Sequence, residues 1–257
     1  MNRKRYNLVM PTEFGTVIVN HNDQGLPDAR YGVFWQLSQT GTLEAEQMEL
    51  IRKSVSLCLP DPVVLDIGAN IGIVSLSIAN SVQGAKIFAF EPQRIIFQML
   101  AGNMALNSIE NVFCFHLAVG DTNGHIPIPK IDYGSMASFG SLEFGRTTQS
   151  DAGQNARLAG PDVEMVQIVT IDSLGFQRVD FMKIDVEGME VAVLDGARGT
   201  ITANKPILCV EALKCDKNRL SNLLTSFGYN LHTQGQNLFC LHREQPFHRA
   251  VERFLDR

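Results

Sequence analysis

The chain has 257 residues, of which 45% are hydrophobic and 19% are charged, and its formal net charge is -5. This length and composition predict one folded domain with a sizeable core and exclude a disordered or coiled-coil protein. The mildly acidic balance gives no general attraction for nucleic acid or anionic lipid, so we expect no nucleic-acid partner.

The cysteine count and the apolar runs indicate in which cellular compartment the protein is expected. Five cysteines without a Cys-x-x-Cys pair argue against a disulfide framework and a structural zinc site. The basic segment 1–10 lacks the apolar run of a signal peptide. No apolar stretch reaches the roughly 20 residues that span a bilayer. We therefore expect no membrane span and a cytoplasmic location.

The first 60 residues are expected to form an irregular N-terminal extension (1–60) that packs on the main domain (61–257). A short strand is predicted over 14–19. A helix is predicted over 43–59, where apolar residues recur at steps of three and four. Proline at position 60 ends this helix, because proline disfavours the helical conformation at the residue before it.

Short apolar strands alternate with helices from residue 61 onward. The predicted strands cover 63–67, 86–90, 112–116, 181–184 and 207–210, and the predicted helices cover 71–80, 92–107, 187–197 and 217–227. This alternation indicates a mostly parallel sheet buried on both faces. Two successive strands near 229–232 and 238–242 predict an antiparallel addition at one edge. The segment 132–161, rich in small polar residues, is expected to be functional or mobile and to lie over a site.

A glycine-containing turn follows the first of these strands. It reads Asp66-Ile67-Gly68-Ala69-Asn70-Ile71-Gly72. Ligands of open α/β sheets bind beyond the carboxyl ends of the strands, and glycine lets them approach the backbone. The free N–H groups of the following helix favour an anion, and Asp66 would meet an ammonium group or a water network. The spacing is not Gly-x-Gly-x-x-Gly, so the nicotinamide fingerprint is not satisfied.

Glu91 ends the second strand, 25 residues after Asp66. A carboxylate at this place can accept hydrogen bonds from both hydroxyls of a ribose. The alternative is that the glycines only form a turn and that Glu91 only caps the helix that follows Pro92. The order of strand, glycine turn, helix, strand and acid favours a cofactor site.

These stretches resemble the FkbM-type methyltransferase family. The matching segments are 64–72, 90–92, 183–190 (Lys-Ile-Asp-Val-Glu-Gly-Met-Glu) and 193–197, together with 170–174 and 206–211. The resemblance implies a Rossmann-like class I methyltransferase sheet that uses S-adenosylmethionine. It also implies a small-molecule or glycan acceptor, most often a hydroxyl of a sugar or natural product. Carried over to this chain, the residues lining the cofactor are Asp66, Gly68, Asn70, Gly72 and Glu91.

The catalytic residues are expected at the ends of the next two strands. Methyl transfer requires an in-line arrangement, and a hydroxyl acceptor often needs a general base or a metal. Asp185 and Glu211 follow adjacent strands, so one of them is the predicted base, with Glu187 orienting. Glu187 and Glu190 are expected to share a helix face. The alternatives are capping of that helix, or a hard divalent ion such as Mg²⁺ at these acids, although no metal is assigned.

Aromatic residues and histidines offer further hypotheses. Trp35, with Tyr31 and Phe34, forms either a wall for the acceptor or part of the core. His116 is expected on the adenine side of the cofactor or at the surface, and His248 on a solvated tail helix.

Three other functions compete with methyl transfer to a small molecule. A nicotinamide-dependent oxidoreductase would need the missing glycine fingerprint. A cofactor-binding module without turnover would keep the glycine turn and Glu91. A nucleic-acid methyltransferase would carry an Asn-Pro-Pro-aromatic motif, which is absent. A homodimer is left open.

Overall fold

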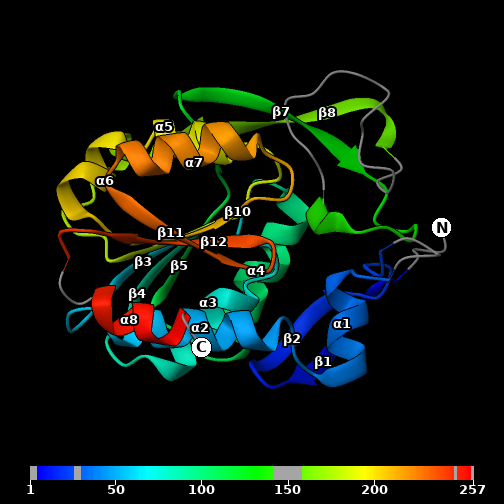
Figure 1. The fold of residues 1–257 in the computed structure, drawn as a ribbon. Coiled ribbons are helices and arrows are strands. Elements are labelled where there is room, and N and C mark those ends of the chain that lie inside the picture. The colour runs from blue at the N-terminus through cyan, green and yellow to red at the C-terminus, as the bar shows by residue number, and fades with distance from the viewer. Residues whose placement is uncertain (1–4, 26–29, 142–157, 246–247, 256–257) are drawn as a thin grey trace.

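The computed structural model describes residues 5–25, 30–141, 158–245 and 248–255. Helices cover both faces of a central sheet (Figure 1). The strands are β1 (Asn7–Thr12), β2 (Gly15–Asn20), β3 (Val63–Ile67), β4 (Lys86–Phe90), β5 (Val112–Phe115), β6 (Ala118–Val119), β7 (Gly124–Ile131), β8 (Leu158–Val169), β9 (Phe181–Ile184), β10 (Ile207–Glu211), β11 (Tyr229–Gln234) and β12 (Asn237–His242). The α-helices are α1 (Val33–Thr40), α2 (Ala45–Ser56), α3 (Ile73–Ser81), α4 (Arg94–Leu106), α5 (Glu190–Asp195), α6 (Arg198–Asn204), α7 (Lys217–Ser226) and α8 (His248–Leu255).

The central sheet has the strand order β11-β12-β10-β9-β3-β4-β5. The five strands from β10 to β5 are mutually parallel, and β12 pairs antiparallel with both β10 and β11. The predicted α/β class and the antiparallel addition are therefore confirmed. The antiparallel strand is β12, one position in from the edge. Successive strands extend in opposite directions from β3, which makes the junction of β3 and β9 the switch point where such sheets bind ligands.

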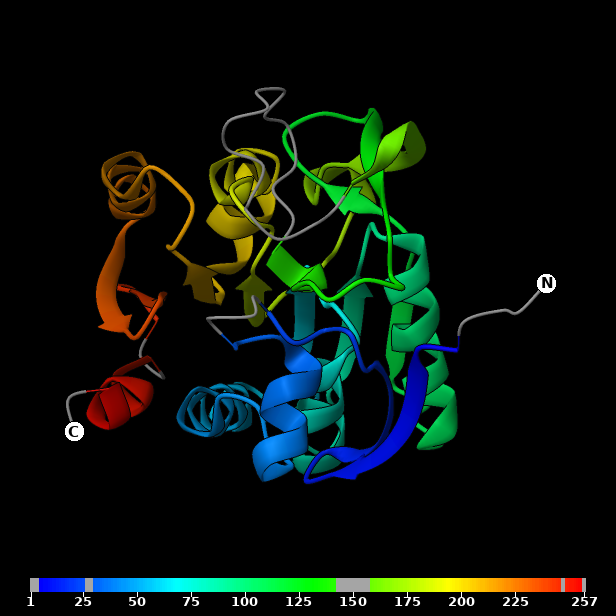
Figure 2. The ribbon, with the colours of Figure 1, turned by 90° about the vertical axis from the view of Figure 1, so that its right-hand side faces the viewer.

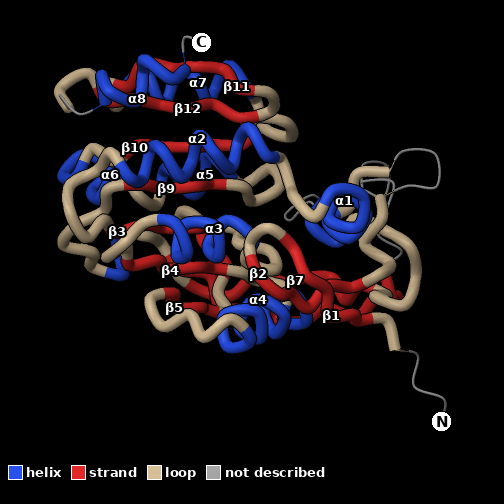
Figure 3. The backbone as a smooth tube through the Cα atoms, turned by 90° about the horizontal axis from the view of Figure 1, so that it is seen from below, coloured by secondary structure: helices blue, strands red, loops and turns tan. Residues whose placement is uncertain are grey.

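The central parallel strands β3, β9 and β10 are buried on both faces, which explains their largely apolar sequences. Val64 points to one face, toward a core that includes buried residues of α2, α3 and α4. Leu65 points to the other face, toward a core that includes residues of α5, α6 and α7. Seen from below, α2, α3, α4 and α8 lie over the first face (Figure 3). Because of this alternation, Asp66 and Lys183 lie on the same face of the sheet as α2 and α3.

The predicted strand over 14–19 and helix over 43–59 are confirmed as β2 and α2. The N-terminal extension is less irregular than expected, because the described residues 5–25 and 30–56 also include β1 and α1. The hairpin of β1 and β2 lies beside α4 (Figure 2). Its backbone is fixed there by two asparagines: Thr16 N donates to Asn107 Oδ1 (2.9 Å) and Ile18 N to Asn103 Oδ1 (2.6 Å). These contacts join residues about 90 positions apart, which local sequence patterns do not indicate. The division into 1–60 and 61–257 stays a prediction.

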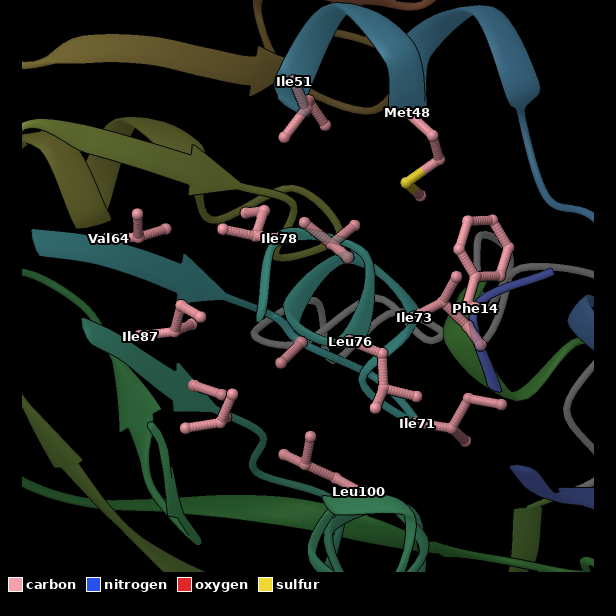
Figure 4. Close-up of a cluster of buried hydrophobic side chains, with 14 of the residues drawn as sticks. Phe14, Met48, Ile51, Val64, Ile71, Ile73, Leu76, Ile78, Ile87 and Leu100 are labelled. Atoms are coloured by element: carbon pink, nitrogen blue, oxygen red, sulfur yellow. The ribbon is translucent and has the colours of Figure 1, made fainter. Parts of the chain in front are cut away.

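Helix α2 covers the centre of the sheet. Its predicted apolar stripe is present, and Met48 and Ile51 point from α2 toward α3 and β3 (Figure 4). Both side chains are at most 1% exposed, as is Ile78 of α3. Burial of each such side chain stabilises the fold by about 1.5–3 kcal/mol. The N-terminal segment is thus part of the core that supports the sheet.

Two helix predictions need correction. The helix predicted over 187–197 begins only at Glu190, because Glu187 (φ 57°) and Gly188 (φ 102°) have left-handed backbones that a helix cannot include. It ends at Asp195, and α6 follows. The tail helix α8 is not fully solvated, since Val251 and Leu255 are buried in the core beneath α2.

The segment predicted to cover a site falls partly outside the described residues, which end at 141 and resume at 158. Its first part, 132–141, crosses beside the end of β4 and includes a short 3-10 helix (Phe139–Ser141). Among the helices of the described residues, none combines the length and the apolar character needed to cross a bilayer.

Candidate active site at the carboxyl ends of the sheet

A cavity of about 1080 Å³ opens at the carboxyl ends of β3, β4, β9 and β10. It therefore lies at the switch point of the sheet. Every predicted site residue except Gly72 lines it: Asp66, Gly68, Asn70, Glu91, Asp185, Glu187 and Glu211. The chain brings these residues together from four strand ends, as the sequence predicts.

The glycine turn forms the floor of the cavity. Gly68 has φ 82°, and a Cβ at this position would lie 1.8 Å from the backbone oxygen of Asp185. Only glycine allows the ends of β3 and β9 to approach so closely. Gly72 (φ 89°) is the N-cap of α3, and Leu100 and Met104 fill the space beside it. Gly72 thus shapes the turn from behind the cavity.

Asp66 is fully buried at the end of β3. Its Oδ2 accepts a hydrogen bond from Ser75 Oγ of α3 at 2.7 Å. No hydrogen bond from the described residues reaches its Oδ1. Burial raises the pKa of this carboxyl, and the nearby Lys183 ammonium opposes that rise. A buried acceptor atom without a donor destabilises the fold, so Oδ1 indicates a ligand that donates a hydrogen bond.

Glu91 is 4% exposed, and each of its two oxygens accepts a backbone hydrogen bond. Its Oε1 accepts from Gln93 N (2.8 Å) at the start of α4, which is the capping role. Its Oε2 accepts from Asn70 N (3.0 Å) in the glycine turn. Burial raises the pKa of Glu91 to about 7, although these two N–H groups lower it. Each oxygen keeps a lone pair for a further donor from the cavity.

Lys183 lies in the middle of β9 and is 6% exposed. It stands opposite Asp66 in the pairing of β9 with β3. Its Nζ donates to Oδ2 of Asp185 at 2.7 Å. Burial alone would lower the pKa of Lys183, but the carboxylates of Asp185 and Asp66 raise it above its usual value. The ammonium therefore stays charged between two acids.

Three carboxylates converge beside this pair. One oxygen each from Asp185, Glu187 and Glu211 lies within 4.8 Å of the others. Burial and the charges of Asp185 and Glu187 raise the pKa of Glu211 to about 8. Burial and Asp185 raise the pKa of Glu187 to about 7, against the attraction of Lys214, with which Glu187 forms an ion pair.

The trio has the spacing of a cation site, but its charges are already balanced in part. Lys183 pairs with Asp185, and Lys214 pairs with Glu187. Hard divalent ions favour oxygen ligands that are free to surround them. Two of the three carboxylates therefore already have a lysine as an ion-pair partner.

The predicted partnership of Glu187 and Glu190 on one helix face is wrong, since Glu187 precedes the helix. Glu190 is fully buried, and its Oε1 accepts from Gly188 N (3.0 Å) and Val186 N (3.3 Å). It fixes the left-handed turn that presents Glu187 to the cavity. This is a structural role for the second acid of the motif.

The three aromatic residues proposed as an acceptor wall have different environments in the structure. Tyr31 and Trp35 line the cavity, whereas Phe34 packs against the core. His116 follows β5, stacks on Phe97 and contacts Pro92 O (3.0 Å), next to the cavity wall. It is a neighbour of the β4 end and does not line the cavity.

The sequence analysis did not identify several residues that line the cavity. Lys214 follows Glu211 by three residues, and a basic residue so close to a strand-end acid is a usable signal. Glu44 and Gln47 reach the cavity from the N-terminal segment, and Ser138 and Gly140 from the 132–141 segment. Their sequence neighbourhoods carry no motif, because only the tertiary fold brings them to the site.

The strand order, the glycine turn and the acid at the end of β4 define a Rossmann-like class I methyltransferase fold. The family described as Methyltransferase FkbM domain matches residues 66–238. The chain belongs to this family.

Three similar proteins illustrate the relationship. "Methyltransferase sdnD" of Sordaria araneosa is 28% identical in an alignment 161 residues long that covers 53% of this chain and 60% of that protein. "2-O-methyltransferase NoeI" of Sinorhizobium fredii is 29% identical over 165 residues, 62% of this chain and 67% of that protein. A crystal structure of Methyltransferase FkbM from Methylobacillus flagellatus is 20% identical, with a TM-score of 0.48, covering 71% of this chain and 43% of that one. This chain thus matches less than two thirds of the Sordaria and Methylobacillus proteins.

Proposed function

We propose that the protein transfers the methyl group of S-adenosylmethionine to a hydroxyl oxygen of a sugar or natural-product acceptor. The observation that carries this proposal is that two groups of acids line one cavity. Asp66 and Glu91 come from the strands β3 and β4 that flank the glycine turn, and Asp185, Glu187 and Glu211 come from the ends of β9 and β10. The name of the Sinorhizobium relative, a 2-O-methyltransferase, supports oxygen as the atom that is methylated.

The residues around the glycine turn fit S-adenosylmethionine. The buried Oδ1 of Asp66 lacks a hydrogen-bond donor among the described residues and suits an ammonium group. Glu91 can accept from two ribose hydroxyls. The turn from Gly68 through Asn70 to Gly72 leaves the backbone open and places the start of α3 toward a carboxylate. When bound, the cofactor supplies an activated methyl group on a positively charged sulfur.

Glu211 is the base in this proposal. A hydroxyl that gains a methyl group must lose its proton, and Glu211 Oε2 is buried without a hydrogen bond from the described residues. Asp185 is paired with Lys183, and Glu187 with Lys214, whereas Glu211 forms no such ion pair among the described residues. Asp185 and Glu187 instead orient the acceptor and raise the basicity of Glu211 through their charge.

Calorimetry tests the cofactor directly. S-adenosylmethionine, NAD⁺ and NADP⁺ are titrated separately into the purified protein and into the Glu91→Ala variant. We expect micromolar binding of S-adenosylmethionine alone, weakened at least tenfold in the variant because two hydrogen bonds to the ribose are lost. Glu110→Ala, an exposed acid before β5, is the matched control and should bind normally. Binding of a nicotinamide cofactor instead would overturn the proposal.

A second experiment separates an enzyme from a module that binds without turnover. The protein is incubated with methyl-labelled S-adenosylmethionine and a set of glycosides and hydroxylated natural products. Label transferred by the wild type and not by Glu211→Gln supports O-methyl transfer. Tight cofactor binding without transfer to any member of a broad set would favour the binding module.

A further inference from the structure

The segment 137–140 forms a wall of the cavity beside the glycine turn. Ser138 and Gly140 line the cavity, and Phe139 between them is fully buried. A Cβ on Gly140 would lie 2.6 Å from Asn70 Nδ2, so there is no room for a side chain between this wall and the glycine turn. The hydrogen-bond geometry of a single 3-10 turn is poor, and the position of the 137–140 wall therefore depends on contacts with other segments.

Phe139 is held by hydrogen bonds from both of its backbone polar groups. Its N donates to Oδ1 of Asp23 at 3.3 Å, and its O accepts from Gln93 Nε2 at 2.9 Å. The backbone N of Gln93 donates in turn to Oε1 of Glu91, the acid expected to bind the ribose, at 2.8 Å. A continuous chain of hydrogen bonds therefore connects Glu91 to Asp23 through the 137–140 wall.

Asp23 is 3% exposed and does not line the cavity. Burial raises the pKa of its carboxyl to about 7, although the backbone N–H groups of Phe139 and Val33 lower it. A buried carboxyl destabilises a fold unless donors satisfy its oxygens, and here the donors belong to the 137–140 wall and to the start of α1. The side chain therefore joins two segments that line the cavity, without lining it itself.

The backbone of Asp23 fixes the place of this carboxyl. Asp23 and Ala137 form a parallel bridge, in which Gln24 N donates to Ala137 O at 3.0 Å. The carbonyl of Asp23 accepts from Trp35 N (3.2 Å) in the first turn of α1. The Asp23 side chain therefore extends the backbone attachment of the wall by two residues, from Ala137 to Phe139.

We propose that Asp23 is a positioning residue for the cofactor: its carboxylate holds the 137–140 wall against the glycine turn, so that the affinity for S-adenosylmethionine depends on a side chain outside the cavity. The inference rests on the proposed function. Asp23 precedes residue 66, where the family match begins. The N-terminal segment thus supports the cofactor site from outside the part of the chain that the family defines.

The test measures the Kd of S-adenosylmethionine by calorimetry, without any acceptor, in the wild type and in variants of Asp23. Asp23→Ala leaves the buried N–H of Phe139 without its acceptor, and we expect the Kd to rise about tenfold, which corresponds to one hydrogen bond to a charged group. Asp23→Asn keeps an oxygen that can accept from Phe139 N, so its Kd should stay within about threefold of the wild type. Asp23→Leu keeps the branched shape without an acceptor, and it gives the same readout if Asp23→Ala does not fold.

Asp180→Ala is the matched control for a general loss of stability. Asp180 is also buried, and its Oδ2 accepts from Val63 N at 2.8 Å, but it precedes β9 at the end of that strand opposite to the cavity. Both alanine variants should lower the melting temperature, because each leaves a backbone N–H without its acceptor. Only Asp23→Ala should raise the Kd of S-adenosylmethionine.

The outcomes separate the two proposals. A wild type that does not bind S-adenosylmethionine would overturn the proposed function, and this inference with it. Wild-type affinity in folded Asp23→Ala and Asp23→Leu would overturn the inference alone. An equal rise of the Kd in Asp180→Ala would do the same, because lost stability would then account for the effect. So would an Asp23→Asn variant as weak as Asp23→Ala, because asparagine keeps the acceptor oxygen.

Discussion

Lys183 Nζ lies 2.7 Å from Asp185 Oδ2, and this ion pair gives two neighbouring strand-end carboxylates different environments. Asp185 has a buried cation as its partner. Glu211, on the adjacent strand β10, has an Oε2 that receives no hydrogen bond from the described residues. Both acids end parallel strands, and from the sequence alone either is a candidate base. Under the proposed function, Asp185 therefore has a positioning role and Glu211 the proton-accepting role.

The first prediction concerns this separation. Glu211→Gln should lower kcat by about 100- to 10,000-fold, the range for loss of a general base, with little change in S-adenosylmethionine affinity. Asp185→Asn should instead destabilise the fold by about 3–5 kcal/mol, because it leaves the Lys183 ammonium buried without its partner. Labelled methyl transfer and urea unfolding measure the two effects. A stable Asp185→Asn variant with the larger loss of kcat would reverse the assignment.

The second prediction concerns pH. Burial and the charges of Asp185 and Glu187 raise the pKa of Glu211 to about 8, so the carboxyl is protonated below that pH and is a base only above it. The proposed activity should therefore rise with pH, with a midpoint near 8. Glu187→Gln removes one repelling charge and should move the midpoint to lower pH. Glu110→Gln, on the surface, should leave it in place, and a midpoint that rises in Glu187→Gln would contradict the argument.

The sequence predicts the parts of the site that depend on local pattern. Val63–Ile67 is apolar because its strand is buried on both faces, and the turn after it contains Gly68 because β9 passes so closely. Carboxyl ends of parallel strands meet at one edge, so the convergence of Asp66, Glu91 and Glu211 follows from the strand order. These features are encoded within short segments.

The parts that could not be predicted depend on contacts between distant segments. Gln47 accepts a hydrogen bond from Asn237 across 190 residues, and Glu44 lines the cavity although it lies 22 residues before the family match begins. The left-handed backbone of Glu187 overrides a helical pattern because Glu190 binds the N–H groups of the turn. Neither effect leaves a periodic signal, so the sequence patterns extended the helix too far and missed Glu44 as a residue of the cavity lining.

The third prediction concerns metal dependence. Lys183 and Lys214 already pair with two of the three converging acids, so the proposed activity should survive exhaustive treatment with EDTA. Added Mg²⁺ should change the rate by less than about twofold, since the charge of the trio is largely balanced. The test compares labelled methyl transfer before and after chelation. Loss of activity on chelation, restored by Mg²⁺, would establish the carboxylates as a cation site instead.

The fourth prediction concerns the contact between the glycine turn and β9. Gly68→Ala would place a Cβ 1.8 Å from the backbone oxygen of Asp185, in addition to the strain of φ 82°. Backbone cannot move as a flexible side chain can, so we expect a loss of unfolding free energy of at least about 3 kcal/mol and loss of S-adenosylmethionine binding. Gly175→Ala is the matched control, because it has φ 68° and open space, and should cost only about 1–2 kcal/mol. Urea unfolding of both variants measures the difference. Equal losses would mean that strain alone accounts for Gly68, whereas a larger loss at Gly68 assigns the excess to the close approach of β3 and β9 on which the cavity depends.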